Sequence, residues 1–337
     1  MRRAIELLFL VPFCVFSANG QQPVPDFSAD GKAVSGYMAK WDQRVGELMF
    51  YRIVDSRSAV AIRLVKPDGG SVAIRPLEDL PGARSVTIWD IAETLDGGAV
   101  FCATVEYAPP HTKPMPLKSL VMTYDVAGRL TRFWDVYPYG FLHIAVDSTG
   151  AVFAFGAKST ADDHDPLLVK YSQDGRVLGQ FLPANLFSGG LGVLNTGPTT
   201  GESEMFVAGE RIFLWLATTQ ELLTLSRTGE VVGRTSLQNA LKSLAAETNS
   251  SRAIVNHVSV RRDGEIVAQV QLGPLAGTKA GVKMAMVAFS TDTTVAHPIS
   301  TIMEAKQSGH FLGVSQDGKL LFLEPGPEQA QLMIRRY

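Results

Sequence analysis

The chain has 337 residues, of which 46% are hydrophobic and 19% charged, and its formal net charge is −2. This composition provides enough apolar side chains for a large core. The near-neutral charge excludes the broad basic surface with which proteins bind nucleic acid or anionic lipid, so we expect no nucleic-acid partner. The 31 glycines and 18 prolines are spread along the chain, which is typical of many turns and not of a long disordered tract.

The first 20 residues have the pattern of a secretory signal peptide. The basic pair Arg2-Arg3 precedes an apolar run from Leu7 to Phe16, and Ala18-Asn19-Gly20 offers a small-x-small cleavage site. The run is too short to span a bilayer, which takes about 20 residues, and no later segment is long and apolar enough to do so. We expect a mature protein, residues 21–337, that is secreted or periplasmic and forms one domain.

Cysteine usage follows from this cleavage. Cys14 leaves with the signal peptide, and only Cys102 remains in the mature chain. A single thiol forms no intramolecular disulfide, so the core alone must hold the fold together. Cys102 follows Phe101 in an apolar segment, and we interpret it as a small packed side chain in preference to a reactive nucleophile.

Short apolar segments joined by tight Asp-Gly or Thr-Gly turns recur along the chain in two alternating forms. Residues 143–153 represent one form, and residues 168–178 represent the other. Glycine allows the positive φ that such turns need, and the flanking apolar residues alternate with the two-residue period of a strand. The sequence therefore predicts a series of antiparallel β-hairpins.

The hairpins repeat with a nearly constant spacing. Turns of the first form fall near Gly98, Gly150, Gly209, Gly264 and Gly318, at intervals of 52, 59, 55 and 54 residues. Each repeat therefore contains two hairpins, or four strands, and a mature chain from residue 21 has room for about six repeats. Turns of the second form lie between those of the first, at Gly69, Gly128, Gly175, Gly229 and near Asp292.

This pattern predicts an all-β fold, a β-propeller with six four-stranded blades. Blades that pack face to face around an axis bury both sheet faces and leave only short edges. We expect residues 331–337 to form the third strand of the last blade and residues 27–34 to supply its outer strand, which closes the ring. A β-sandwich is the competing fold, but it does not predict two alternating hairpin forms at constant spacing. Residues 39–58 fit the repeat least well, and five or seven blades remain alternatives.

Two features outside the hairpins are predicted to pack against the blades. Ser236 is a candidate N-cap for a helix in which Leu237, Leu241 and Leu244 form one apolar stripe, in a connection between blades. The tryptophans are expected to pack between blades; they are Trp41, Trp89, Trp134 and Trp215.

Two segments carry a resemblance to a known family. Residues 144–153 and 169–177 resemble the repeats of bacterial six-bladed propellers of the NHL-repeat and TolB-like type, and the likeness extends over most of the mature chain. The resemblance implies a funnel-shaped ring with a central channel. Members of that group range from ligand-binding and scaffolding modules to lyases and lactonases. The repeat pattern weakens at residues 207–210 and 291–294, so the subfamily stays open.

A functional site is expected in the central channel, where the inner strand of each blade brings side chains to similar heights. His143 and His257 lie seven residues before the turn glycines of their repeats, and His310 lies eight before its own. Three imidazoles with an open fourth position are typical of catalytic zinc sites, and the resemblance includes lyases that hold zinc by histidines from separate blades. Asp90 lies seven residues before Gly97 and Glu202 lies seven before Gly209, and these two are the candidate acid or base.

Other segments have weaker functional patterns. The acidic residues 160–165 have oxygen ligands for calcium but lack the glycine and distal glutamate of a calcium loop, so a solvated turn is favoured. The proline-rich residues 108–116 favour an extended surface loop. No contiguous enzyme signature such as Gly-x-Ser-x-Gly or His-Glu-x-x-His is present.

Two functions are consistent with these patterns. The first is a secreted, monomeric, non-catalytic propeller that binds a small molecule, glycan or peptide at the face where the inner strands begin, with no assured cofactor. The second is a metal-dependent lyase or hydrolase in which His143, His257 and His310 hold a divalent metal such as zinc. Histidines that only hydrogen-bond the channel backbone and water would favour the first.

Overall fold

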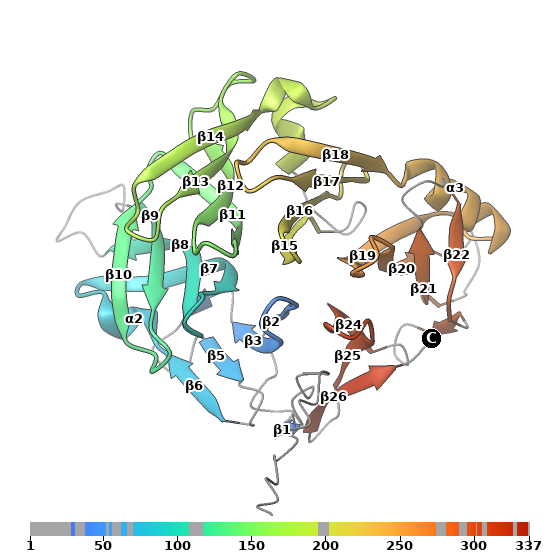
Figure 1. The fold of residues 1–337 in the computed structure, drawn as a ribbon, viewed down its shortest axis with the longest axis horizontal. Helices are drawn as coiled ribbons and strands as arrows, with labels where there is room; N and C mark the ends of the chain where they lie inside the picture. Colours follow the sequence, from blue (N-terminus) through green and yellow to red (C-terminus); the bar gives the residue numbers. More distant parts are fainter. Residues whose placement is uncertain are drawn as a thin grey trace, which may run out of the picture.

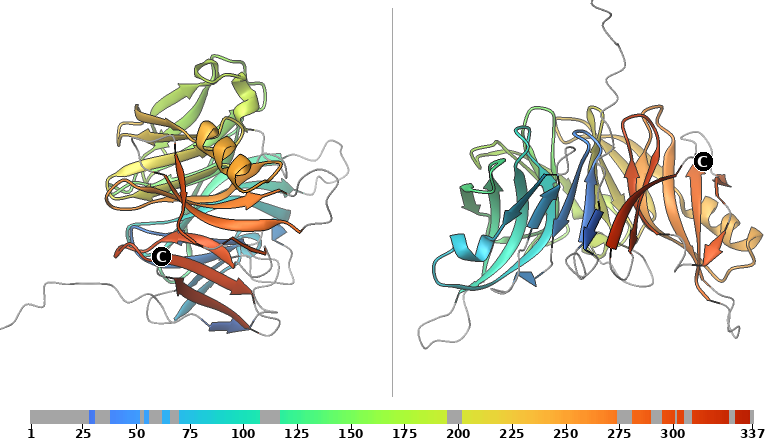
Figure 2. Two further views of the ribbon diagram at one scale, coloured as in Figure 1. Left: turned by 90° about the vertical axis from the view of Figure 1, so that its right-hand side faces the viewer. Right: turned by 90° about the horizontal axis from the view of Figure 1, so that it is seen from below.

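The fold is a closed ring of β-sheets. A computed structural model describes residues 28–30, 38–51, 54–55, 62–65, 70–107, 117–194, 202–273, 281–289, 295–300, 302–304, 309–325 and 329–335. The described strands form six antiparallel sheets around a central axis (Figure 1). The side views show these sheets standing next to one another around that axis (Figure 2). The predicted all-β propeller with six blades is confirmed.

Each blade begins with its innermost strand and continues outward. Blade 1 contains β2 (Met38–Asp42), β3 (Glu47–Tyr51), β5 (Ile62–Val65) and β6 (Ser71–Ile74). Blade 2 contains β7 (Ala83–Glu93), β8 (Ala99–Tyr107), β9 (Leu117–Tyr124) and β10 (Leu130–Asp135), with β4 (Val54–Asp55) beside β7. Blade 3 contains β11 (Tyr139–Val146), β12 (Val152–Lys158), β13 (Pro166–Tyr171) and β14 (Val177–Pro183). Blade 4 contains β15 (Glu204–Ala208), β16 (Arg211–Leu216), β17 (Glu221–Leu225) and β18 (Val231–Ser236). Blade 5 contains β19 (Ala253–Val260), β20 (Ile266–Leu272) and β21 (Lys283–Phe289), with β22 (Ala296–Pro298) and β23 (Met303–Glu304) both paired to β21. Blade 6 contains β24 (His310–Val314), β25 (Leu320–Pro325), β26 (Gln329–Arg335) and β1 (Ser28–Asp30).

The two ends of the chain close the ring in blade 6. Strand β1 pairs antiparallel with β26, so that Ser28 lies opposite Gln331 and Asp30 opposite Gln329. The inner strand of every blade contacts the inner strands of both neighbours, including β24 of blade 6 and β2 of blade 1. The predicted closure, with an N-terminal segment as the outer strand of the last blade, is confirmed.

The repeated glycines lie in the turns that the sequence predicts. In blade 1 the equivalent turn contains Gly46 (φ 80°), which the repeat pattern missed because no Asp-Gly or Thr-Gly pair marks it. Gly69 and Asp292 lie outside the described residues. In blades 2 to 6 the first turn holds a glycine with φ between 58° and 91°, namely Gly97, Gly150, Gly209, Gly264 and Gly318.

The outer turns of blades 3 and 4 pack on the outer strand of the preceding blade. A Cβ atom at Gly175 would lie 2.8 Å from the ring of Trp134, and one at Gly229 would lie 2.5 Å from the ring of Phe181. Both glycines also have positive φ, at 82° and 93°. Glycine is therefore required at these turns for both backbone conformation and close approach between blades.

The core is divided among the interfaces between blades. Six clusters of buried apolar side chains occur, and each joins two neighbouring blades around the ring. Cys102 belongs to the cluster between blades 2 and 3. Burial raises the pKa of its thiol, so the interpretation of Cys102 as a packed side chain is confirmed.

Three of the four tryptophans pack between blades as predicted. Trp41 and Trp215 are buried in such clusters, and Trp134 packs against the cluster between blades 2 and 3. The prediction is wrong for Trp89, which is 43% exposed. A β-bulge in β7 at this residue interrupts the strict alternation of sides on which the prediction depended.

In the described part of the chain, four helical segments connect the strands: α2 (Pro76–Asp79), the 3-10 segments η1 (Ala184–Leu186) and η2 (Gly190–Leu194), and α3 (Gln238–Glu247). Helix α3 joins blades 4 and 5, where a helix was predicted. The predicted N-cap is wrong by one residue, because Ser236 ends β18 and Leu237 occupies the cap position. None of the described helices is long and apolar enough to cross a bilayer.

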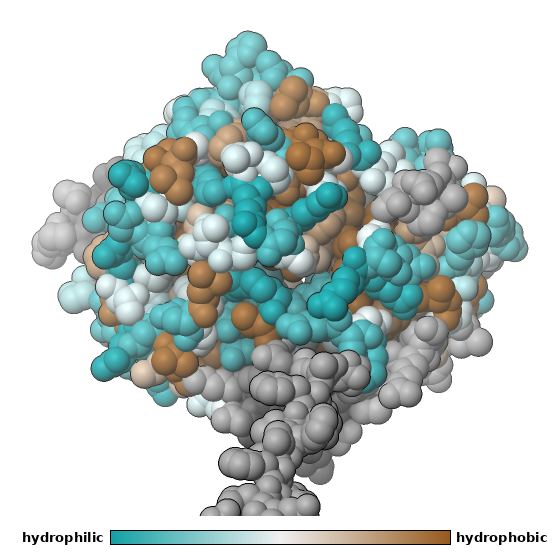
Figure 3. Space-filling model, in the orientation of Figure 1, coloured by the Kyte–Doolittle hydropathy of each residue, from teal (hydrophilic) through white to brown (hydrophobic). Residues whose placement is uncertain are grey.

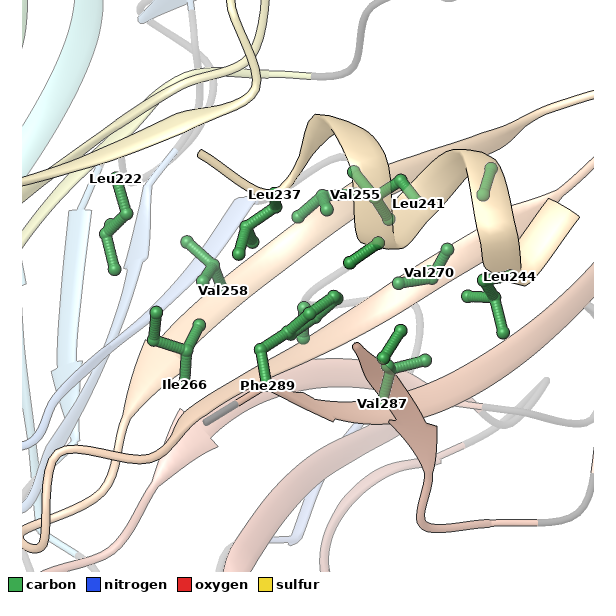
Figure 4. Close-up of a cluster of buried hydrophobic side chains, with 14 of the residues drawn as sticks. Leu222, Leu237, Leu241, Leu244, Val255, Val258, Ile266, Val270, Val287 and Phe289 are labelled. Atoms are coloured by element: carbon green, nitrogen blue, oxygen red, sulfur yellow. The ribbon is translucent and has the colours of Figure 1, made fainter. Parts of the chain in front are cut away.

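The apolar stripe of α3 should contribute strongly to stability. Leu241 is buried beside Val255 and Val270 (Figure 4). We expect Leu241→Ala to lower the free energy of unfolding by about 2–3 kcal/mol, because it leaves a cavity between helix and sheet. Urea denaturation measures the change, with the exposed Lys242→Ala on the same helix as control. Equal effects of the two substitutions would contradict this packing.

Candidate functional site

A cavity of about 320 Å³ lies on the axis of the ring. Its walls contain residues of all six inner strands: β2, β7, β11, β15, β19 and β24. These strands surround the centre of the ring in Figure 1. The cavity therefore occupies the central channel in which the sequence predicts a site.

The turn that joins β2 to β3 closes one end of this channel. Gln43 donates from Nε2 to the carbonyl of Val260 at 3.2 Å, and Arg44 donates from Nη2 to the carbonyl of Glu93 at 2.8 Å. Gln316 of blade 6 donates to the carbonyl of Arg44 at 2.8 Å. These partners lie where the inner strands end, so the cavity opens where they begin. On the face drawn in Figure 3, the surface around the centre of the ring is mostly hydrophilic.

Four inner strands carry a β-bulge within the channel wall. The bulges lie in β7, β11, β19 and β24. A bulge re-aims the extra side chain and disrupts the ladder locally, which is why bulges are frequent at functional sites. The bulged residues all line the cavity, and they are Trp89, Leu142, Asn256 and Leu312.

The bulges explain the spacing of the candidate residues. Asp90, His143 and His257 each follow the bulged residue of their strand directly, which places them at equivalent positions and accounts for their common offset of seven residues. His310 instead lies two residues before the bulge of β24. Its offset of eight therefore marks a different position in the wall.

Asp90 holds three blades together. It is 4% exposed, and its carboxylate accepts hydrogen bonds from Lys40 Nζ at 2.7 and 2.8 Å. The backbone N–H groups of Ile91 and Ile144 donate to the same carboxylate at 2.8 and 2.9 Å. These four hydrogen bonds, from three donor groups, use the hydrogen-bonding capacity of a carboxylate. The geometry therefore gives Asp90 a structural role at the junction of blades 1, 2 and 3.

His143 is a neutral imidazole beside this junction. Its Nδ1 lies 3.8 Å from Asp90 Oδ2, and its buried Nε2 has no hydrogen-bond partner among the described residues. Desolvation lowers the pKa of His143 to about 4, although Asp90 opposes this shift. The ring stacks on Phe155 with centroids 6.2 Å apart. At neutral pH, His143 offers one donor and one acceptor and no charge.

A second polar cluster lies on the opposite half of the wall. His257 Nδ1 contacts Glu204 Oε1 at 2.6 Å, and its Nε2 lies 3.1 Å from the carbonyl of Leu312. A carbonyl only accepts, so Nε2 carries a proton. Burial alone disfavours the charged ring, but Glu204 and the Leu312 carbonyl raise the pKa of His257 above its usual value. The contact with Glu204 therefore favours the charged form of the His257 ring.

His310 lies next to this pair. The centroids of the His257 and His310 rings are 5.8 Å apart. Desolvation within the channel wall and the charge of His257 lower the pKa of His310 to about 4. His310 is therefore a second neutral imidazole in the channel.

The three predicted metal ligands do not lie together. His257 and His310 are neighbours on blades 5 and 6, whereas His143 is on blade 3. Both nitrogens of His257 are also engaged, by Glu204 and Leu312. In the described part of the chain, no three His, Cys, Asp or Glu side chains are grouped so as to hold a metal ion. The three-histidine metal site stays a prediction, and it requires rearrangement of His257.

Glu202 is exposed and lines the cavity. Glu204, two residues after Glu202, was not predicted from the sequence. Alternate residues of an extended segment share one face, so the spacing of two residues from Glu202 was the signal that could have identified it. Lys40 was not predicted either, because the first turn of blade 1 lacks the Asp-Gly or Thr-Gly pair that marks most of the other inner strands. Neither partner is adjacent in sequence to the group that it contacts.

The acidic loop between β12 and β13 uses its side chains locally. Asp165 pairs with Lys158, and the carboxylate of Asp162 accepts a hydrogen bond from the backbone N–H of His164. These contacts agree with an ordinary solvated turn. The proline-rich residues 108–116 lie outside the described residues.

A buried acid lies at the closed end of the channel. Glu93, the last residue of β7, is 2% exposed and lies near Asp42, Glu47 and Arg44. Desolvation and the two neighbouring carboxylates raise the pKa of Glu93 to about 9, although Arg44 opposes the shift. The folded protein therefore keeps a proton on Glu93 at neutral pH.

This proton makes stability depend on pH. Between about pH 4.5 and pH 9 the folded state holds a proton that the unfolded chain releases, so the free energy of unfolding falls as pH rises. We expect Glu93→Gln, which mimics the neutral acid, to be more stable than the parent by about 1–3 kcal/mol at pH 8 and to differ little at pH 4.5. Denaturant unfolding at both pH values measures this, with the exposed Glu247→Gln as control. An unchanged pH dependence in Glu93→Gln would contradict the buried proton.

Comparison with known proteins adds similarity at the level of the fold. The sequence matches no protein-family model and none of the curated proteins. A streptogramin B lyase structure has 12% identity, covering 92% of this chain and 98% of its own with a TM-score of 0.48. The calcium-binding protein regucalcin from Agrobacterium tumefaciens has 12% identity, with coverage of 92% and 94% and a TM-score of 0.46. A protein of unknown function from Bacteroides caccae has 10% identity, with coverage of 80% and 86% and a TM-score of 0.44. At these identities and TM-scores, none of them transfers an activity to this chain.

Proposed function

We propose that this protein is an exported β-propeller that binds a small molecule at the open end of its channel and does not catalyse a reaction there. The observation that carries the proposal is the cavity of about 320 Å³, which all six inner strands line and the β2–β3 turn closes at one end. Closed, mostly apolar cavities of a few hundred Å³ are typical small-molecule sites. Its volume favours a small molecule over a longer glycan or peptide.

The pairing of the polar groups supports binding over catalysis. Asp90 accepts four hydrogen bonds, and both nitrogens of His257 are engaged. His143 and His310 have pKa values of about 4, far below the range near neutral pH at which an acid–base catalyst works best. Their neutral rings are suited to orient a ligand by hydrogen bonds.

Export rests on the signal-peptide pattern of residues 1–20, which lie outside the described residues. Cleavage after residue 20 keeps strand β1, which begins at Ser28 and closes the ring. The mass of the mature protein from the secreted or periplasmic fraction tests this proposal. It should correspond to a chain that begins at Gln21, and an uncleaved chain in the cytoplasm would contradict it.

The binding proposal is tested by filling the cavity. Leu142→Trp adds bulk at a bulged position of the channel wall, whereas Leu178→Trp adds the same bulk at an exposed site on β14 of the same blade. Crystals soaked with small aromatic fragments should show density beside Trp89 in the parent and in Leu178→Trp, and none there in Leu142→Trp. Fragments that bind only outside the channel would contradict the proposal.

The metal-dependent lyase or hydrolase is the second candidate, and the adjacency of His257 and His310 is the observation in its favour. Elemental analysis of the purified protein and of His143→Ala tests it. Stoichiometric zinc, manganese or iron that is lost in His143→Ala would support this candidate, and its absence from the parent would remove it.

A further inference from the structure

The charges that line the channel are paired, with one exception. Lys40 pairs with Asp90 at 2.7 Å, and His257 pairs with Glu204 at 2.6 Å. Asp42 pairs with Arg44 at the closed end. Glu202 is the remaining charged residue of the wall, and no cation lies within ion-pair range of it in the part of the chain that the structure describes. Among the described residues, the open end therefore has one negative charge without a paired cation.

The channel also presents an aromatic ring. Trp89 is 43% exposed, unlike the tryptophans between blades. Its indole Nε1 donates to Thr104 Oγ1 at 2.9 Å, which holds the ring in one orientation. An indole that is already fixed loses little conformational entropy when a ligand packs on it. Trp89 is thus a preorganised surface for contact with a ligand.

The negative groups act on a common part of the channel. The hydroxyl of Tyr51, which lines the cavity, has a pKa raised first by burial and then by Asp90, Cys102, Glu202 and Glu204. Asp90, Glu202 and Glu204 line the same cavity as Tyr51. A cleft with walls of low dielectric focuses such a field.

The other described residues of the wall do not offer a positive site. Lys40 is bound by both oxygens of Asp90, and the charge of His257 is matched by Glu204. His143 and His310 are neutral at pH 7. An anionic ligand would therefore meet Glu202 without a free cation to balance it. Much of the wall is apolar, with residues such as Met38, Met205 and Leu312.

We propose that the ligand of this channel is an apolar cation, a substituted ammonium whose charge faces Glu202 and whose alkyl or aryl groups pack on Trp89. The inference rests on the proposed function, because it requires the channel to be the binding site. Cation–π attraction to a tryptophan and the field of an unpaired carboxylate both favour the charged form of such a ligand over a neutral molecule of the same shape.

The test compares two probes of equal shape, choline and its neutral analogue 3,3-dimethylbutan-1-ol. Binding is measured by titration of the tryptophan side-chain N–H signals in NMR spectra, with Trp89 assigned from Trp89→Phe. We expect choline to bind at least about fivefold more tightly than the alcohol, which corresponds to about 1 kcal/mol. Glu202→Gln should reduce this preference to less than twofold while leaving the affinity for the alcohol unchanged.

Matched variants separate the possible outcomes. Glu230→Gln, at an exposed turn of the outer strands, should keep the preference of the parent. Trp89→Ala should weaken binding of both probes. If the alcohol binds as tightly as choline and Trp89→Ala weakens both, the inference is wrong but the channel still binds ligands. If neither probe shifts the Trp89 signal, the inference is wrong, and the fragment soak described above decides the proposed function separately.

Discussion

Lys40→Met is expected to lower the free energy of unfolding by about 3 kcal/mol or more. The side chain of Lys40 is 18% exposed and that of Asp90 is 6% exposed. Removal of the ammonium group leaves the Asp90 carboxylate buried with only two backbone donors, and an uncompensated buried charge is costly. Urea denaturation at pH 7 measures the loss.

Two further variants show that the loss comes from the ion pair. Adding Asp90→Asn to Lys40→Met should recover part of the stability, because the charge that was left unpaired is removed. The exposed Lys242→Met should change stability by no more than about 0.5 kcal/mol. If Lys40→Met has no larger effect than Lys242→Met, the salt bridge does not hold blades 1 and 2 together.

Arg44→Met is expected to have an effect of similar size, about 3 kcal/mol. The side chain is 11% exposed and pairs with Asp42. It also donates to the carbonyls of Glu93 and Asp147, at 2.8 and 3.4 Å. Its loss removes one donor from each of these carbonyls and takes away the cation that pairs with Asp42 beside the buried Glu93, and both effects destabilise the fold.

The pH dependence distinguishes this effect from a simple packing defect. Arg44 opposes the raised pKa of Glu93, so its removal should raise that pKa further and extend the fall in stability to pH values above 9. The control is Arg129→Met, because the side chain of Arg129 is 80% exposed in its pair with Asp125. A loss equal to that of the control, with unchanged pH dependence, would mean that the β2–β3 turn does not close the channel.

The fold was predictable because turn chemistry is local. A glycine with positive φ at each first turn, as in Gly150 and Gly264, marks a hairpin wherever it occurs, and the interval between such turns reveals the repeat. Blade 1 was the exception. Its turn, residues 43–46, lacks the Asp-Gly or Thr-Gly pair and instead carries the polar side chains that contact other blades across the channel.

The site was predictable only in part. The offset of seven residues located Asp90, His143 and His257, because the bulge recurs at one height in their strands. Their partners were not predictable, because Lys40 and Glu204 come from other blades and nothing in the local sequence specifies which side chains meet across the channel. The exposure of Trp89 was not predictable, because it results from a β-bulge. A one-residue insertion changes the apolar pattern of a strand too little to be recognised in the sequence.

The measurement that tests this account most directly is a crystal structure of residues 21–337. We expect a closed ring of six blades in which the β2–β3 turn lies across one end of the channel and the Trp89 side chain lines the cavity. A channel open at the β2–β3 turn, or a Trp89 side chain packed between blades away from the cavity, would contradict it.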